Sequence, residues 1–223
     1  MHKSEEIQEV INEVFIRLRE LQINLDSANI LIFEKNTKDI VCWTGSSAKN
    51  STSSLFRYTE LAFLTDIVKA NEDQIDLFTH KYSREQKNDF FNYVYDTTTL
   101  KETPNDRKQF ILESPYHTVS VAFSKNIAIN LNSYSRESFT EDENKIVIRF
   151  AKVFEQSYTR FLDLQKAEAQ AREAQIEAAM EKVRARALAM QKAEELIEVA
   201  QVLRNEMGLL GVEELETSSI YIH

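Results

Sequence analysis

The segment HTVSVAFSKNIAINL, residues 117–131, contains two short runs in which apolar side chains alternate with polar or small ones. Alternation with a period of two is typical of β-strands. The polar pair Lys125-Asn126 lies between the two runs and predicts a tight turn. We therefore expect residues 117–123 and 127–131 to be neighbouring antiparallel strands of one sheet.

The chain before this segment predicts the rest of the sheet. Residues 28–33 and 39–44 are apolar and β-branched, and the polar residues 34–38 separate them, which is the pattern of a β-hairpin. Further strands are expected at 55–58 and 74–80, and helices at 59–70, from Ser83 onward and at 103–112. Strands with helices inserted between them predict an α+β domain, an antiparallel sheet flanked by helices.

Helices are predicted at both ends of this domain. Apolar residues recur at spacings of three and four between Ser4 and Gln22, which indicates an amphipathic helix within residues 1–24. The sequence Thr140-Glu-Asp-Glu143 is a capping box that begins a second, exit helix. The predicted domain covers residues 1–163, with the sheet and its inserted helices in 28–132 and the start of the exit helix in 140–163.

The exit helix is expected to be long, because neither Gly nor Pro occurs between Glu141 and Met207. If it is helical throughout, these residues would extend for about 100 Å. We expect residues 164–195 to form a coiled-coil linker, because a seam without a partner would expose its Phe and Leu side chains. The alternative is a single solvated helix held by charge pairs such as Glu168 with Arg172.

The coiled-coil prediction rests on an a/d seam that a second copy of the chain would cover. Ser157 is its weak position, and the strict heptad fails between Leu164 and Ile176, where we expect a stutter. The residues predicted to face the partner helix are Val147, Phe150, Phe154, Phe161, Leu164, Ile176, Met180, Val183, Ala187 and Met190.

The sequence also contains an internal repeat. MHKSEEIQEV, residues 1–10, and MQKAEELIEV, residues 190–199, share Met, Lys, three Glu and Val at equivalent positions. The strand sequence at 28–33 has a counterpart at 218–223, after a nearly equal interval. Residues 196–223 are therefore predicted to be the truncated start of a second unit, in which residues 213–223 are disordered or pair with a sheet edge.

Composition excludes several classes of function. The net charge of −9 disfavours nucleic acid, and the 3 Gly residues cannot build a P-loop or a dinucleotide-binding fingerprint. Cys42 is the single cysteine, and the 4 His residues lack metal-ligand spacing, so we expect no disulfide and no metal site. No apolar run is long enough to span a membrane, and no signal peptide is evident, which predicts a cytoplasmic protein without membrane contact.

The predicted plan resembles that of a GAF domain. The sequence FTEDE, residues 139–143, and the exit helix over 149–179 closely resemble GAF-like sensor modules strung in tandem in large bacterial signalling proteins, often two-component histidine kinases. The runs ILESPY at 111–116 and DFFNY at 89–93 fit the same group. The resemblance implies a regulatory module that forms a homodimer through its N-terminal and C-terminal helices and passes a conformational signal along the helix.

In the GAF plan, the inserted helices and strands cap a ligand pocket. Aromatic residues gather there, and the predicted pocket residues are Phe56, Tyr58, Phe63, Phe78, Phe90, Phe91 and Tyr95. They would bind an unidentified small molecule; the alternative is an ordinary aromatic core without a ligand, which would make the chain a purely structural dimerisation spacer.

The sequence lacks the motifs of several known GAF activities. Lys125-Asn126 reverses the Asn-Lys order of cyclic-nucleotide binders, and Cys42 is expected in the core rather than on a chromophore. His80 and His117 are expected as polar residues near strand ends rather than haem ligands. Residues 141–207 contain no His to accept a phosphoryl group, and no catalytic constellation is evident, so we predict neither enzymatic activity nor a cofactor, with any catalytic core outside this chain.

Overall fold

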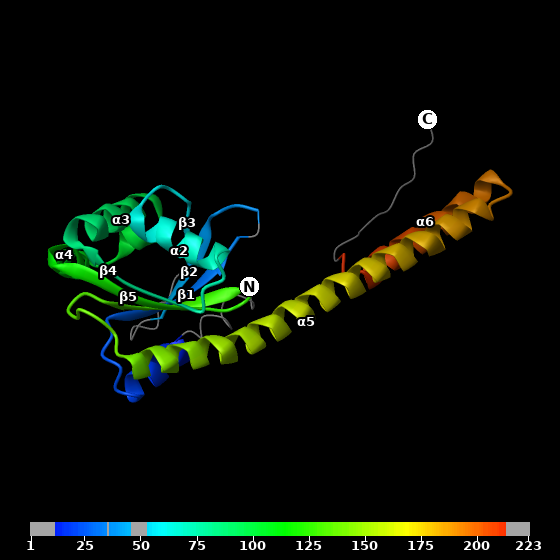
Figure 1. Cartoon of the computed structure of the whole chain (residues 1–223). Helices are drawn as coiled ribbons and strands as arrows, with labels where there is room; N and C mark the ends of the chain where they lie inside the picture. The colour runs from blue at the N-terminus through cyan, green and yellow to red at the C-terminus, as the bar shows by residue number, and fades with distance from the viewer. Residues whose placement is uncertain (1–11, 35, 46–52, 213–223) are drawn as a thin grey trace. The chain divides into compact units, whose positions relative to one another are not determined.

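The computed structural model describes residues 12–34, 36–45 and 53–212 (Figure 1). These residues form two compact units, which meet between Thr159 and Arg160. The described parts of each unit are treated in turn. The predicted state of residues 213–223, and the first 11 residues of the predicted N-terminal helix, lie outside the described residues.

Unit 1 is built on a six-stranded antiparallel sheet of order β3-β2-β1-β6-β5-β4. The hairpin β1–β2 and the hairpin β5–β6 join through β1 and β6 at the centre of the sheet. The strands are β1 (Ser27–Phe33), β2 (Ile40–Gly45), β3 (Ser53–Phe56), β4 (Leu77–Ser83), β5 (Tyr116–Phe123) and β6 (Ile127–Ser133). The predicted α+β class and the antiparallel sheet are confirmed.

Strand β4 begins three residues later than the sequence predicted, because the preceding helix uses residues 74 and 75 to end. Gln74 has a φ of 55°, and the N–H of Ile75 donates to the carbonyl of Ala70 over 3.1 Å. This is the hydrogen bond of a left-handed helix cap. The apolar alternation from residue 74 onward therefore includes two residues that terminate a helix.

Helices cover both faces of the sheet (Figure 1). One face, which we call the covered face, packs against α2 (Ala62–Glu72), α3 (Arg84–Thr97) and α4 (Asn105–Glu113), with the short helix η1 (Thr99–Glu102) between the last two. The other face packs against the helical residues 12–20 and the first turns of α5 (Glu141–Leu188). Alternate residues of the central strands therefore enter two separate cores, as in the neighbours Ile30 and Leu31.

The exit helix begins with the predicted capping box. The N–H of Glu143 donates to Thr140 Oγ1 over 3.3 Å, and the N–H of Thr140 donates to Glu143 Oε2 over 2.7 Å. Farther along, Val147, Ala151 and Phe154 are buried against the sheet of their own chain. Val147 and Phe154, which the sequence analysis placed on a seam facing a second chain, therefore face this sheet, and Phe150 is half-buried beside the same cluster.

Unit 2 is a helical hairpin rather than one continuous helix. Helix α5 ends at Leu188, η2 (Ala193–Glu195) follows a turn, and α6 (Leu196–Leu209) runs back along α5 (Figure 1). Lys182 Nζ lies 3.0 Å from Glu206 Oε1, which fixes the antiparallel register of the two helices. The small side chain of Ala179 and that of Val199 are buried at this contact, 6% and 5% exposed.

The remaining residues predicted to face a second chain are more exposed than Val147 and Phe154. Phe161 is half-buried and Leu164 is 56% exposed. In the hairpin, Ile176 and Val183 are half-buried, whereas Met180, Ala187 and Met190 are exposed. Within the described residues, the predicted seam thus has an open side that starts after Phe154.

The helix of residues 12–20 and helix α6 end in the same way. The equivalent hydrogen bonds, 189 residues apart, run from the N–H of Ile23 to the carbonyl of Leu18 and from the N–H of Val212 to the carbonyl of Met207. In each case the residue before the donor is left-handed, with a φ of 61° at Gln22 and 79° at Gly211. These helix ends, which follow the two matching sequences at the same interval, thus share a local helix-terminating structure.

Candidate functional site

The predicted pocket residues come together on the covered face. Phe56, Phe63, Phe90 and Phe91 are buried there, and Tyr58, Phe78 and Tyr95 pack around them. The rings of Phe63 and Phe90 lie 4.6 Å apart, and those of Phe90 and Phe91 lie 5.2 Å apart. The structure therefore gathers all seven residues into one apolar cluster, in which the rings of Phe56, Phe63, Phe90, Phe91 and Tyr95 contact one another.

His117 lies at the centre of this aromatic cluster, on β5. It is 1% exposed, and its ring faces those of Tyr134 at 5.3 Å and Phe91 at 5.5 Å. Its Nε2 lies 2.8 Å from Oδ1 of Asn132. Burial lowers the pKa of His117 to about 4, so the ring is neutral at pH 7. The sequence analysis expected a polar strand-end residue; the side chain is instead buried, because α3 covers this end of β5.

Three asparagines form a polar row beside His117 on the adjacent strands β1 and β6; Asn130 and Asn132 are buried, and Asn29 is half-buried. Asn130 Nδ2 donates to Asn132 Oδ1 over 3.0 Å, and Asn29 is the cross-strand neighbour of Asn130. The Oδ1 atoms of Asn29 and Asn130 are buried and have no hydrogen-bond partner among the described residues. A buried acceptor without a partner costs about 1–3 kcal/mol, so this row is energetically unfavourable as it stands.

A second polar group joins α3 and α4 to the start of β1. Arg107 Nη1 lies 3.8 Å from Asp26 Oδ1, and its guanidinium lies over the ring of Tyr134 at 5.5 Å. The hydroxyl of Tyr95 is buried without a partner among the described residues. Burial raises the pKa of Tyr134. Arg107 opposes this rise, whereas Tyr95 and Asp26 add to it. These four side chains therefore meet at one end of the covered face.

Lys87 on α3 is a buried lysine that ties α3 to α4. It is 1% exposed, and its Nζ donates to Asn88 Oδ1 over 2.6 Å and to the carbonyl of Ile111. Burial lowers the pKa of Lys87 to about 8, and the positive charge of Arg84 adds to the shift. The two helices over the polar row are thus held together by a group that loses its charge in mildly basic solution.

The lysine predicts a distinctive pH dependence. Between pH 8 and the ordinary lysine pKa of 10.5, the unfolded chain holds a proton that the folded chain has released, so the contribution of Lys87 to the free energy of unfolding rises with pH. Burial raises the pKa of Cys42, which acts in the opposite direction above pH 9 in every variant, so the effect of Lys87 is the difference between wild type and Lys87→Met. We expect that difference to change by about 1 kcal/mol between pH 8 and pH 10, in favour of the wild type. Urea unfolding at three pH values measures it, and Lys69→Met, whose lysine is exposed on α2, should follow the wild type. Parallel pH profiles of wild type and Lys87→Met would contradict the assignment.

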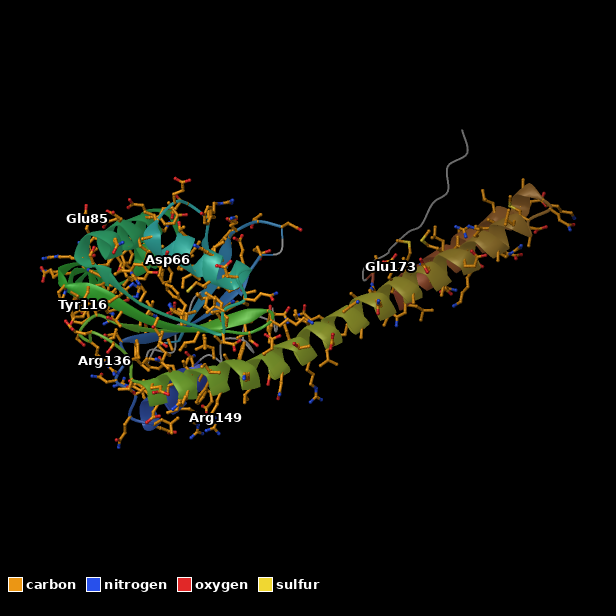
Figure 2. The ribbon with its side chains drawn as sticks, in the orientation of Figure 1. Asp66, Glu85, Tyr116, Arg136, Arg149 and Glu173 are labelled. Atoms are coloured by element: carbon orange, nitrogen blue, oxygen red, sulfur yellow. The ribbon has the colours of Figure 1, made fainter. Side chains whose placement is uncertain are left out.

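A charged latch fixes the start of α5 on unit 1 (Figure 2, where Arg136 is labelled). Arg136 donates to both carboxylate oxygens of Glu143, over 2.8 and 2.7 Å, and to the carbonyl of Asn24 over 2.9 Å. Its guanidinium lies over the ring of Phe139 at 4.8 Å. The Arg136 guanidinium lowers the pKa of Glu143 to about 2. The latch therefore joins the segment after the first helix to the beginning of the exit helix.

The latch should contribute to stability only above acidic pH. The folded pKa of Glu143 lies below its ordinary value of 4.5, so its contribution is present above pH 4.5 and disappears as pH falls towards 2. We expect Glu143→Gln to lower the free energy of unfolding by about 1 kcal/mol at pH 6, because partial exposure screens the pair. The difference from wild type should vanish near pH 2. Glu141→Gln, an exposed change in the same helical turn, should have a smaller effect; equal effects would argue against the latch.

The covered face brings several polar groups together inside an apolar, aromatic environment. It offers a neutral imidazole, two amide oxygens and a tyrosine hydroxyl, enclosed by aromatic rings. Cys42 is buried on the same face, as predicted, and burial raises its pKa to about 12.

Within the described ranges, no group of three His, Cys, Asp or Glu side chains could hold a metal ion. Within the same ranges, no helix is long and apolar enough to cross a membrane. Comparison with protein-family models, with curated proteins and with solved structures found no match to this chain.

Proposed function

We propose that the chain is a regulatory sensor and signal-transmission module that binds a small molecule on the covered face of unit 1. The observation that carries this proposal is the pair of buried, unpartnered oxygens on Asn29 and Asn130. A ligand that brought N–H or O–H donors to them would recover hydrogen bonds that the free protein lacks. Ligand binding would thus have a driving force that a fully satisfied core does not offer.

The residues around this row suggest the character of the ligand. The amide oxygens of Asn29 and Asn130 can accept hydrogen bonds, the ring of His117 is neutral, and the surrounding side chains are aromatic. The charged groups beside the cluster, Lys87 and Arg107, already have partners in Ile111 and Asp26. A charged molecule would therefore lose its hydration without an unpaired opposite charge, which favours an uncharged ligand. Binding would require α3 and α4 to move together, because Lys87 joins α3 to α4 and Arg107 joins α4 to Asp26 before β1.

The relay is proposed to run through the sheet into α5. Asn29 and Asn130 lie on the same strands as Ile30 and Ile129, whose side chains enter the opposite core. That core includes Val147, Ala151 and Phe154 of α5. A change in the central strands would therefore reach α5 across one thickness of the sheet, and α5 continues into unit 2.

We propose further that the module is GAF-like, cytoplasmic, part of a tandem array in a two-component signalling protein, and homodimeric through its N-terminal and C-terminal helices. Exposed apolar side chains on both helices support the dimer: Ile16 is 47% exposed, Val153 64% and Leu164 56%. The matching helix ends at residues 23 and 212 support a second unit that begins near residue 190. No catalytic role is proposed for this chain.

The second candidate function is a purely structural dimerisation spacer. The close ring contacts of the aromatic cluster favour a spacer, because Phe63, Phe90 and Phe91 already pack against one another. A spacer would gain nothing from the unpartnered oxygens of Asn29 and Asn130, whereas a sensor would. Replacement of these asparagines therefore separates the two functions.

We expect Asn130→Leu to raise the free energy of unfolding of the free protein by about 1 kcal/mol, because it removes a buried acceptor without a partner. The hydrogen bond from Asn130 Nδ2 to Asn132 Oδ1 is lost as well, but Asn132 Oδ1 keeps its contact with His117 Nε2. The same change should abolish the rise in Tm that a binding compound gives the wild type. Thermal unfolding against a panel of uncharged purine and pyrimidine bases measures both effects, with Thr79→Val, an exposed strand position, as the control. Destabilisation by Asn130→Leu, with no compound that raises the wild-type Tm, would favour the spacer.

A further inference from the structure

One stripe of α5 faces α6 in the hairpin. Arg172 donates from Nη2 to the carbonyl of Leu210, Ala179 is buried, and Arg186 Nη2 lies 3.3 Å from Glu195 Oε2. Together with the half-buried Ile176 and Val183, these positions repeat at spacings of four and three. Such spacing is that of the a/d positions of a coiled coil. Helix α6 therefore covers α5 as a partner helix would.

This stripe overlaps the residues expected to face a second copy of the chain. Ile176 and Val183 belong to both sets, whereas Met180 and Ala187 lie one residue beyond the stripe and remain exposed. Successive residues of a helix are about 100° apart, so the two sets share one broad face of α5. A helix of a second chain cannot cover Ile176 and Val183 while α6 lies on them.

The hairpin itself is lightly held. Among the described residues of the hairpin, Ala179 and Val199 are buried, whereas Ile176 and Val183 are only half-buried. The polar contacts are the hydrogen bond from Arg172 to Leu210 and the pairs of Lys182 with Glu206 and of Arg186 with Glu195 and Glu198. Ion pairs near the surface contribute little stability. The hairpin also leaves large apolar side chains open, with Leu188 80%, Ile197 68% and Leu209 78% exposed.

The connection between the helices has no sequence element that requires a turn. Residues 189–195 are Ala-Met-Gln-Lys-Ala-Glu-Glu, which contain neither Gly nor Pro and are mostly strong helix formers. The helix breaks after Leu188 although the local sequence would allow it to continue. The pairing of α5 with α6 is therefore what stabilises the turn.

We infer that the face of α5 around Ile176 and Val183 is a shared interaction surface, which binds either α6 of the same chain or the same face of a second copy, but not both. The inference rests on the proposed homodimer and adds its regulation: opening of the hairpin makes the surface available for dimerisation. Helix α6 acts as an internal competitor, so any event that displaces it should promote the dimer.

Locking the hairpin tests this inference on the full chain. Lys182→Cys and Glu206→Cys place two thiols where Nζ and Oε1 lie 3.0 Å apart, and a short bis-maleimide can join them. Cys42 is 1% exposed and should not react. Chains linked within themselves, identified by a single-chain mass with one linker and by the loss of both introduced thiols, should dimerise at least tenfold more weakly than unlinked chains in sedimentation velocity. Lys182→Cys alone, treated in the same way, should dimerise at least as strongly as the wild type, because it loses the pair with Glu206 and gains no link.

Opening the hairpin from the α6 side gives the complementary test. Glu195→Arg, Glu198→Arg and Glu206→Lys together leave α5 unchanged but bring like charges against Arg186 and Lys182. We expect about a tenfold stronger dimer, because attraction at these pairs becomes repulsion. Adding Lys182→Glu and Arg186→Glu should restore the pairs and the wild-type equilibrium.

The outcomes separate this inference from the proposed dimer. A dimerisation constant that is the same in the locked and the opened chain would overturn the competition while leaving the homodimer in place. A chain that stays monomeric in the wild type and in the opened variant would overturn both. A weaker dimer in the locked chain and a stronger one in the opened chain would support the inference.

Discussion

Phe154→Ala is expected to lower the free energy of unfolding of unit 1 by about 3–5 kcal/mol, the range measured when a buried Phe is truncated. Phe154 is 6% exposed and lies in the core between α5 and the sheet, with Tyr158 stacked beside it at 6.1 Å. The truncation leaves a cavity that the small neighbour Ala151 cannot fill. The loss should be the largest from any single change at the α5–sheet contact.

The chain carries its own probe for this experiment. Trp43 is the single tryptophan and lies in the same core, so its fluorescence during urea unfolding reports on the contact directly. Lys152→Ala is the matched control, because Lys152 lies in the same helical turn as Phe154 but is exposed. It should change stability by less than about 0.5 kcal/mol. Similar losses in both variants would mean that α5 does not pack on the sheet through Phe154.

The second large effect is the loss of stability that His117 causes in acid. Its folded pKa of about 4 lies below its ordinary value of 6.5, so the unfolded chain binds a proton in this interval that the folded chain does not. The free energy of unfolding should therefore fall as pH drops from 6.5 to 4. The full effect is about 3 kcal/mol, at 1.4 kcal/mol for each pH unit. The nearby charge of Lys87 acts in the same direction as burial.

A ring-for-ring replacement tests this account. His117→Phe keeps an aromatic side chain among Phe91 and Tyr134, and Asn132 Oδ1 keeps the hydrogen bond from Asn130. Urea unfolding of this variant should show little change between pH 6.5 and 4. The exposed ring of His80 provides the control, and His80→Phe should retain the wild-type dependence. A full acid loss in His117→Phe would contradict the assignment. The Glu143 latch acts at lower pH, so the two effects are separable.

Local sequence patterns predicted the sheet because each strand is marked by the residues within it and by the turns beside it. The alternation in 117–131, the polar turn at 125–126 and the capping boxes at Ser83 and Thr140 depend on neighbouring residues alone. The polar row of asparagines was not predicted, since period-two alternation does not tell whether a second layer covers the polar side of a strand. Asn130 and Asn132 lie in such alternation, and the helices α2–α4 bury them.

The end of the exit helix could not be predicted from neighbouring residues either. The break after Leu188 depends on pairs such as Lys182 with Glu206, which are 24 residues apart in the chain. Likewise, the spacing of Val147 and Phe154 predicts an apolar face but does not identify what covers it. In the structure the sheet of the same chain covers that face, and the seam proposed for a second chain is left to later residues of α5.

Native mass spectrometry of the purified chain over a dilution series tests the central claim, a ligand-binding module that dimerises. The account predicts a dimer at twice the chain mass of 25.9 kDa, with a discrete extra mass from a small uncharged molecule bound to each chain. Asn130→Leu should lose the extra mass and keep the dimer. A chain that is monomeric at every concentration and carries no added mass would contradict the account.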